Sequence, residues 1–442
     1  MTMPVDMQPQ LDLVGGGLHV FEREFLVEGD RLVHELRLDD VVHRSSIPFQ
    51  DSNTDDLLGS WWRGYLRGER PSATPKEAPP VRFAELFSGP GGLALGLTQA
   101  CAELGLEAVS AAAADQDAEA MAVYRRRNGT RLTSTESVSM LIDHEVDGQG
   151  VAADFLYEPE IVDEEWAELV GRVDVLLAGP PCQGHSNLNN KTRRNDWRNE
   201  LYLTAPAMAI ALQAPVVIIE NVRAVLHDTR QVVQSSRTLL EAAGYTVDGE
   251  VLKAASMGWA QTRERYFLVA RKGVAPVSLQ TVAAALHAEP HSIWWAISDL
   301  EYPGEGDYMS RPPEFSEENK RRIAYLHDND LYNLPLSERP DCHKDGTTYN
   351  AVYGRLHQDL PAPTITTGFM TPGRGRYIHP TQKRVITARE AARLQGFPDT
   401  YDFRPHSTEQ PAKSKLAKWI GDAVPMPLGY AASLAALLPE LA

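Results

Sequence analysis

A cysteine stands between two prolines and a glutamine–glycine pair in the segment AGPPCQG, residues 178–184. This residue, Cys182, follows an apolar run at 173–177 that predicts a buried strand. A free cysteine most often serves as a small buried hydrophobe. Here, Pro180 and Pro181 stiffen the backbone before the thiol, and open α/β sheets place their ligands just past the carboxyl ends of strands. We therefore interpret Cys182 as a positioned nucleophile.

Charged side chains also stand beside two further apolar runs. Glu220 ends the run VVIIE, and a buried carboxylate is costly unless it is paired or functional. Arg263 and Arg265 lie at the start of the run ERYFLVAR; alternate residues of an extended segment point the same way, so both arginines can face one side. A salt-bridged acid at the end of a sheet is the structural interpretation of Glu220. The functional interpretation places it in the same cleft as Cys182.

A glycine-rich turn follows the first apolar run of the main domain, in FAELFSGPGGLALGL. Gly89, Gly91 and Gly92 stand where backbone approaches a ligand closely, and the helix that follows favours negative charge at its N-terminus. The next apolar run ends in Asp115, at the spacing where an acid meets ribose hydroxyls. These residues predict a nucleotide-like cofactor and leave open whether it is a nicotinamide or an adenosyl compound.

The elements that position these residues alternate between apolar strands and helices. Strands are predicted over 81–87, 107–115, 173–179, 214–222 and 264–271, with helices over 91–105, 118–128, 200–212 and 231–244 between them. This alternation predicts an α/β fold with a parallel sheet covered on both faces. Before it, residues 1–70 read as a small strand-containing extension, and 71–80 read as a linker. Residues 273 to about 385 are rich in Pro, Gly, Asn, Asp and His and predict a second, irregular domain.

Composition limits the class of protein. The chain has 442 residues, which is long for one core, and a formal net charge of −17. That charge argues against nucleic-acid binding unless basic groups gather locally. Two basic segments are candidates, 191–198 and 374–384, although each alone more often forms a solvated loop. Three well-separated cysteines predict no disulfide framework. We find no apolar run of roughly 20 residues and no signal peptide, and we expect a cytoplasmic protein with no membrane contact.

Seven motifs, in this order, resemble those of the DNA (cytosine-5)-methyltransferases of bacterial type, over about 82–429. They are F-x-G-x-G-G at 87–92, G-P-P-C-Q-G at 179–184, D-x-R-N-x-L at 196–201, E-N-V at 220–222, Q-x-R-x-R at 261–265, R-L-Q-G-F-P-D at 393–399 and G-D-A-V-P at 421–425. The resemblance implies a Rossmann-like class I methyltransferase sheet with a smaller target-recognition domain. It predicts an extension and linker over 1–80, a catalytic domain over 81–275 completed by 407–442, and a target-recognition domain over 276–406.

The resemblance implies catalytic roles for four residues. Cys182 would add to C6 of cytosine, and C5 would then accept a methyl group from S-adenosylmethionine. Glu220 would contact N3 and the exocyclic amine, Arg265 would hold O2, and Arg263 would support the site. Because C6 is buried in a duplex, the base must be flipped out. The basic loop after Cys182 would close over it.

Cofactor residues are implied in the same way. Phe87 should lie against adenine, Asp115 should bind the ribose, and Asp154 is expected at the adenine amine. The full expected set is Phe87, Ser88, Gly89, Gly91, Gly92, Asp115, Gln116, Asp154, Pro180, Leu201, Asp422 and Val424.

Four residues depart from the usual pattern of the family. Glu85 replaces an Asp, Gln116 stands where an adenine-stacking aromatic is common, His185 replaces a Phe and Asp422 replaces an Asn. None removes a catalytic group. Asp422 has two interpretations: its carboxylate pairs with the positive charge of the cofactor, or it caps the following turn.

Sequence recognition is expected within about 276–385, because the catalytic domain must treat every cytosine alike. Arg374, Arg376 and His379 are candidate DNA contacts there. In the loop after the cysteine, the expected DNA contacts are Gln183, Ser186, Lys191, Arg193 and Arg194.

The expected partner is double-stranded DNA, bound by a monomer without a metal ion, in a restriction–modification or phage-defence context that can include other defence proteins. An RNA (tRNA) cytosine-5 methyltransferase of the same fold is the alternative. A DNA-binding module without activity is disfavoured by the intact set of Cys182, Glu220 and Arg265. A nicotinamide dehydrogenase would explain neither P-P-C nor Q-x-R-x-R.

Overall fold

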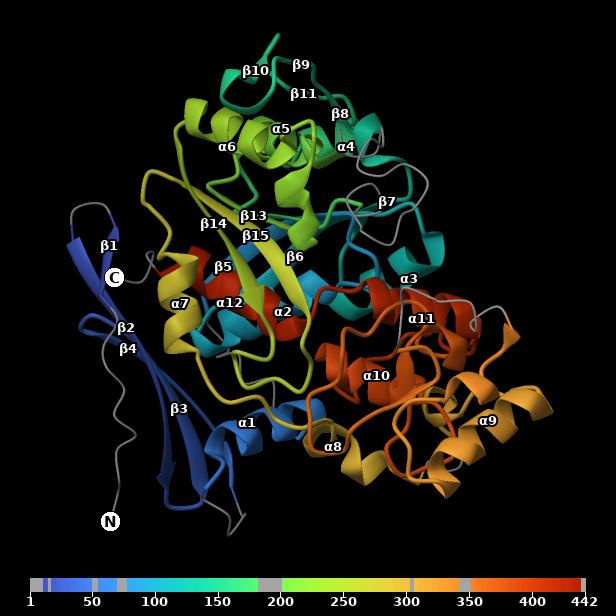
Figure 1. Cartoon of the computed structure of the whole chain (residues 1–442). Coiled ribbons are helices and arrows are strands. Elements are labelled where there is room, and N and C mark those ends of the chain that lie inside the picture. The colour runs from blue at the N-terminus through green and yellow to red at the C-terminus, as the bar shows by residue number, and fades with distance from the viewer. Residues whose placement is uncertain are drawn as a thin grey trace.

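The structure is a computed structural model, and it describes residues 11–14, 17–49, 55–69, 78–181, 201–302, 306–341 and 351–438. Cys182 and the basic loop that follows it, through residue 200, lie outside the described residues. Three bodies are visible in Figure 1: a central sheet with its helices, an N-terminal sheet and a small region around α9.

A seven-stranded sheet forms the centre of the molecule, in the order β14-β15-β13-β12-β5-β6-β7. Its strands are β5 (Pro80–Leu86), β6 (Glu107–Ala114), β7 (Leu132–Ser134), β12 (Val175–Ala178), β13 (Val216–Asn221), β14 (Tyr245–Lys253) and β15 (Glu264–Lys272). β5, β6, β7, β12 and β13 run parallel, whereas β15 runs antiparallel to both β13 and β14. The predicted parallel arrangement is therefore confirmed for β5, β6, β12 and β13 and wrong for β15, because β14 and β15 form a hairpin that adds to the sheet edge in the reverse direction.

Helices cover both faces of this sheet, as the apolar strands predict. α2 (Gly92–Glu103), α3 (Ala118–Asn128) and α12 (Met426–Leu437) lie on one face, and α5 (Thr204–Leu212) and α6 (Val232–Ala242) lie on the other. Neighbouring residues of β5 show the alternation, since Phe83 belongs to the first apolar core and Ala84 to the second. Every residue of β12 and β13 is buried. The order of elements therefore brings the carboxyl ends of β5, β6, β12 and β13 to one edge.

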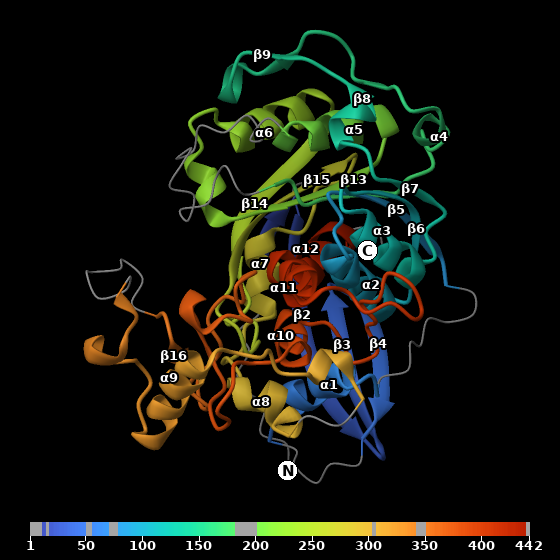
Figure 2. The same cartoon turned by 90° about the vertical axis from the view of Figure 1, so that its right-hand side faces the viewer.

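Residues 135–174 form a long insertion between β7 and β12. It contains two pairs of two-residue strands, β8 (Ile142–Asp143) with β11 (Glu160–Ile161) and β9 (Val146–Asp147) with β10 (Asp154–Phe155), followed by the short helix α4 (Glu164–Ala167). Both views place it over α5 and α6 (Figures 1 and 2).

The N-terminal extension is an antiparallel sheet followed by one helix. Its elements are β1 (Leu11–Val14), β2 (Gly17–Glu28), β3 (Arg31–Leu38), β4 (Val41–Pro48) and α1 (Leu57–Leu66). Apolar side chains of β2 and β3, such as Phe21, Leu32 and Leu36, belong to the same core as α2 and α12. The extension is thus packed onto the central domain.

Irregular structure dominates in the described residues between 286 and 387. The named elements after β15 are α7 (Leu279–Ala285), α8 (Ile293–Ile297), α9 (Glu317–Asp328), β16 (Gly354–Arg355), β17 (Arg376–Ile378), α10 (Ala388–Gln395) and α11 (Lys413–Asp422). A separate apolar cluster contains Ile323, Leu326, Val352 and Ile378, which marks a small unit around α9 and β17. α7, in contrast, packs against β14 and α12 of the central domain. Among the described residues, no helix is long and apolar enough to cross a bilayer.

Candidate active site

A buried ion pair lies at the carboxyl end of β13. Glu220 Oε1 is 2.9 Å from Nε of Arg265, which stands at the start of β15, and their side chains are only 10% and 13% exposed. The two residues meet because β13 and β15 are adjacent and antiparallel, so the end of one strand lies beside the beginning of the other. Burial raises the pKa of Glu220, while Arg265 and then Arg263 oppose that rise. The Glu220 carboxyl therefore keeps its proton to a higher pH than a free glutamate does.

Arg263 has a different position from Arg265. Its side chain is buried, and Nη1 donates to the carbonyl oxygens of Ile365 (2.6 Å) and Gly421 (2.9 Å). Gln261 is also fully buried, and it donates to the carbonyl of Leu394. These residues tie the start of β15 to three distant segments, consistent with the supporting role expected for Arg263.

The turn that leads to Cys182 is fixed from the neighbouring strand. Asn221 Nδ2 donates to the carbonyl of Pro180 over 3.1 Å, and the backbone N–H of Gly179 donates to the carbonyl of Leu86. A side chain at Gly179 would come within 3.9 Å of Oε2 of Glu220. The described part of the turn therefore ends beside Glu220. Asn221 is a functional residue that the sequence motifs did not single out; its one local signal is its place directly after the acid in E-N-V.

Cys182 itself lies outside the described residues, together with Gln183, His185, Ser186, Lys191, Arg193 and Arg194. Their roles remain predictions. The described chain resumes at Leu201, which is half-buried, and the buried Tyr202 follows it. Burial raises the pKa of Tyr202, and the charges of Tyr266 and Glu220 add to that rise, so this segment also lies near the ion pair.

The glycine turn after β5 adopts the backbone that a close-approaching ligand requires. Phe87 has φ of 57°, Gly89 of 50° and Gly91 of 98°, all in the left-handed region. A side chain added at Gly89 would meet open space, whereas one at Gly92 would lie 3.0 Å from the carbonyl oxygen of Val424. The turn is thus open above Gly89 and closed at Gly92 by the G-D-A-V-P segment.

Asp115 lies at the end of β6 and faces this turn. Its Oδ2 accepts the backbone N–H of Gly89 and its Oδ1 that of Asp117, each at 2.8 Å. Burial raises the pKa of Asp115, although the two backbone donors and the charge of Lys418 oppose that rise. Gln116, the next residue, is exposed. The half-buried ring of Phe87, the carboxylate of Asp115 and the open space above Gly89 fit an adenosyl group.

Some of the other expected cofactor residues lie at the same edge as Phe87 and Asp115, and Asp154 does not. The structure brings Ser88, Pro180 and Val424 to the same edge as Phe87 and Asp115, and all three are buried. Asp154 is a correction. It lies exposed on β10 in the insertion, where β10 pairs with β9 and contacts α6, away from β5 and β6 in both views (Figures 1 and 2). The length of the insertion explains the error, because it separates β10 from the strand ends.

Asp422 is half-exposed and forms an ion pair with Lys418, at 3.0 Å one turn earlier on α11. Burial lowers the pKa of Lys418, but the charges of Asp422, Asp115 and Asp117 outweigh it and the net shift is upward. Lys418 therefore interacts electrostatically both with Asp422 and with Asp115, the acid of the cofactor edge. Neither sequence interpretation of Asp422 included this lysine.

The candidate DNA contacts in the small region differ in how exposed their side chains are. Arg374 is exposed. Arg376 is half-buried and donates to the carbonyls of Tyr332 and Arg355, so its guanidinium organises the small region. His379 is a correction: it is fully buried, 3.3 Å from Glu390, and cannot reach a duplex in this structure. Arg384, counted in the second basic segment, is likewise buried on Glu390.

Glu85 is buried in β5, and strand alternation points it to the same face of the sheet as Phe83. Burial is the main cause that raises the pKa of its carboxyl to about 8, and the charge of Asp115 adds to the rise, while the Tyr124 hydroxyl and the Ala94 N–H oppose it. Each pKa unit corresponds to about 1.4 kcal/mol. The folded chain therefore stabilises the protonated form of this acid.

This pKa predicts how stability changes with pH. The folded state binds the Glu85 proton more tightly than the unfolded state, so stability falls as pH rises from about 4.5 toward 8. We expect Glu85→Gln, which is neutral throughout, to gain melting temperature relative to wild type as pH increases from 5 to 9. Thermal unfolding at several pH values measures this, with the exposed Glu136→Gln as the control for loss of one acid. A difference between Glu85→Gln and wild type that stays constant with pH would contradict the assignment.

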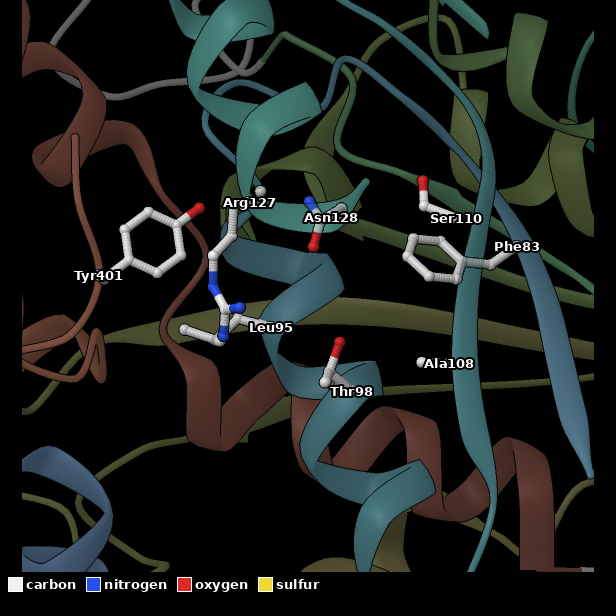
Figure 3. Close-up of a pocket in the computed structure, with 9 residues that line it drawn as sticks. Phe83, Leu95, Thr98, Ala108, Ser110, Arg127, Asn128 and Tyr401 are labelled. Carbon is white, nitrogen blue, oxygen red and sulfur yellow. The ribbon is translucent and has the colours of Figure 1, made fainter. Parts of the chain in front are cut away.

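A cavity of about 140 Å³ lies on the same face of the sheet as Glu85 (Figure 3). Its walls come from β5, β6, α2 and α3, with Tyr401 at one side and the side chain of Arg127 beside it. Gly91 is the only expected cofactor residue in this lining. The cavity therefore lies behind the glycine turn and is separate from the edge that holds Glu220.

The fold and the edge define a class I methyltransferase-like α/β domain with a buried Glu–Arg pair beside a rigid proline turn. Residues 81–435 match the family described as C-5 cytosine-specific DNA methylase. The type II methyltransferase M1.BsuMI of Bacillus subtilis is 38% identical over 416 residues, covering 93% of this chain and 94% of the relative. The type II methylase M.HgiDII of Herpetosiphon aurantiacus is 31% identical, covering 78% and 92%.

Solved structures support the fold. A DNA modification methyltransferase encoded within an E. coli prophage has a TM-score of 0.52 at 22% identity, covering 82% of this chain and 99% of that one. Dnmt2 of S. pombe has a TM-score of 0.51 at 17% identity, with the same coverage. The chain belongs to the C-5 cytosine-specific DNA methylases and is a DNA (cytosine-5)-methyltransferase.

Proposed function

We propose that the protein transfers a methyl group from S-adenosylmethionine to C5 of a flipped-out cytosine in duplex DNA, through a covalent bond between Cys182 and C6, as part of a restriction–modification or phage-defence system. The observation that carries the proposal is the buried pair of Glu220 and Arg265 beside the turn at Gly179 and Pro180. The family of the chain supports a DNA substrate.

Each group at the edge has a chemical task in this proposal. The Cys182 thiolate adds to C6. The π electrons of the C5–C6 double bond shift into the rest of the ring, so negative charge develops toward N3. Glu220, whose pKa is raised by burial, supplies a proton or hydrogen bond at N3 as that charge develops, and Arg265 holds O2. After C5 has been methylated, loss of its proton expels the thiolate and restores the aromatic ring.

The edge formed by Phe87, Gly89 and Asp115 would hold the cofactor. S-adenosylmethionine supplies the methyl group when it is bound. Phe87 would stack on the adenine, Asp115 would accept from the ribose hydroxyls, and the backbone at Gly89 would approach the ligand without hindrance. Val424 closes the edge where its backbone touches Gly92.

The negative charge of the chain is compatible with DNA binding because it is unevenly distributed. Residues 136–168 hold eleven acids and no Lys or Arg, and most of this segment lies in the insertion over α5 and α6. Most of the excess charge is therefore concentrated in one segment. The basic loop after Cys182 and the exposed Arg374 stand outside it.

Trapping with a fluorinated base tests the adduct. A long duplex copied with 5-fluorodeoxycytidine presents every possible site, so the unknown recognition sequence is no obstacle. With S-adenosylmethionine present, we expect a band on a denaturing gel that contains both protein and DNA, because fluorine at C5 blocks the final elimination. A shifted band only with 5-fluorocytidine RNA would identify an RNA methyltransferase. Methylation of unmodified DNA without any trapped band would contradict the adduct.

A further inference from the structure

The N-terminal extension lies outside the segment that matches the methylase family, which begins at residue 81. Its helix α1 nevertheless buries three large aromatic side chains, Trp61, Trp62 and Tyr65, at 0, 3 and 6% exposure. In both views α1 lies next to α8, between the β2–β4 sheet and the small region (Figures 1 and 2). A ten-residue helix that inserts so much aromatic surface is an integral part of the core.

Trp62 reaches the segment that carries the site arginines. Its ring packs edge-to-face on Trp259, with centroids 5.9 Å apart, and on Tyr430 of α12, at 5.5 Å. Trp259 belongs to the irregular connection between β14 and β15, a few residues before Arg263 and Arg265. Irregular backbone has no ladder of its own to fix it, so its position depends on such packing.

The end of α1 holds a second segment. Tyr65 donates its hydroxyl to the carbonyl of Gly396 over 3.0 Å, and Asp399 donates its N–H to the carbonyl of Leu66 over 2.7 Å. Both partners lie in R-L-Q-G-F-P-D, the turn that follows α10. α1 therefore contacts both the connection that precedes Arg263 and Arg265 and the turn at 396–399.

These two connections are joined to each other and to the cofactor edge. Trp259 Nε1 and Gln261 Nε2 each donate to the carbonyl of Leu394 over 2.7 Å. Gln395 donates onward to the carbonyls of Ile420 and Ala423, next to the residues that close on Gly92. Displacement of one connection would therefore move the other.

The β2–β4 sheet gives α1 a fixed base. Buried Glu103 of α2 accepts from Trp61 Nε1 at 3.2 Å and from the hydroxyl of Tyr430, and its Oε2 lies 3.2 Å from Nδ1 of His34 on β3. Arg23 of β2 donates to the carbonyl of Leu286. Buried polar contacts of this kind fix one relative orientation of the parts that they join.

From these contacts we infer that residues 17–49 and 55–69 act as a brace, in which Trp62 and Tyr65 are positioning residues. They hold the connection before Arg263 and Arg265 and the segment 394–399 in the positions that place Arg265 beside Glu220. The inference rests on the proposed function, because it assigns the extension to the same reaction. It gives a positioning role to a part of the chain that touches neither the DNA base nor the cofactor in the proposed mechanism.

The test compares Trp62→Phe and Tyr65→Phe with Trp166→Phe, which alters a fully buried tryptophan in the insertion. Small displacements of positioned groups cost rate more than binding. We expect each brace variant to lose about 10-fold or more in kcat for methyl transfer, with KM for DNA unchanged and a melting temperature no lower than that of Trp166→Phe. Because Arg265 holds the pKa of Glu220 down, Trp62→Phe should also move the alkaline limb of the pH–rate profile upward. Wild-type kcat and pH profile in both brace variants would overturn the inference.

A second measurement is independent of activity. Hydrogen–deuterium exchange should be faster at 254–265 in Trp62→Phe and at 394–399 in Tyr65→Phe, and should match wild type at both segments in Trp166→Phe. Unchanged exchange in the brace variants would overturn the brace even if the wild type methylates DNA. A wild type that methylates no DNA, with the expected exchange, would overturn the proposed function and leave the brace as a structural device.

Discussion

Replacing the thiol of Cys182 with hydrogen, in Cys182→Ala, is expected to abolish methyl transfer, with a loss of at least about 10⁴-fold in kcat. The thiolate is the group that makes C5 nucleophilic, and among the described residues of this edge there is no second thiol. Cofactor binding should persist, because the cofactor edge is built from the ends of β5 and β6 and from the G-D-A-V-P segment. Radiolabelled methyl incorporation into genomic DNA measures the rate, and calorimetry measures cofactor affinity.

Cys101 offers a matched control for this experiment. It is buried near the end of α2, within the apolar core. Cys101→Ala removes the same atom and should keep wild-type kcat, with some loss of melting temperature from the small cavity. Turnover in Cys182→Ala equal to that of Cys101→Ala would remove the nucleophile assignment.

Replacing the buried acid in Glu220→Gln is expected to lower kcat by about 10²- to 10⁴-fold, the range for a lost proton-transfer group. Gln keeps the shape and can still contact Arg265, but it cannot deliver a proton to N3. Binding of DNA should change little, because the loss falls on the charge that develops during addition. Single-turnover rates and DNA affinity, measured on the same preparation, separate these two quantities.

The pH dependence of the methylation rate provides a further test of the role of Glu220. Burial raises the pKa of Glu220, so the protonated acid persists to higher pH than for a free carboxyl, and wild-type activity should fall as pH rises through that pKa. Glu220→Gln should lack this limb. A variant with wild-type kcat, or with the same alkaline limb, would show that Glu220 serves only as the partner of Arg265.

Much of this arrangement follows from local sequence pattern. Short apolar runs that alternate with helices predict β5, β6, β12 and β13, and residues that directly follow such strands must meet at one edge, as Asp115 and Glu220 do. The direction of β15 could not be predicted in this way, because an apolar strand reads the same whether it runs parallel or antiparallel. That direction is what brings Arg265 to Glu220.

Other features depend on distant parts of the chain and carry no local signal. The local sequence around His379 predicts an exposed loop. In the structure His379 is buried beside Glu390, which also pairs with Arg384. Asp154 was expected at the adenine amine, but its short strand belongs to the insertion. Trp259 and Gly396, which α1 contacts, are far away in the sequence, so no local pattern could predict these contacts. The domain boundaries near 275 and 406, and the DNA contacts, stay predictions.

Bisulfite sequencing of DNA from a host that expresses the protein tests the central claim most directly, because it reports the modified base and its sequence context together. The host should lack cytosine methylation of its own, and cells expressing Cys182→Ala provide the background. We predict protected cytosines at every copy of one short sequence motif in wild-type cells and none in the variant. Fully converted genomic DNA from cells that contain the folded wild-type protein, with protected cytosines found instead in their RNA, would contradict the account.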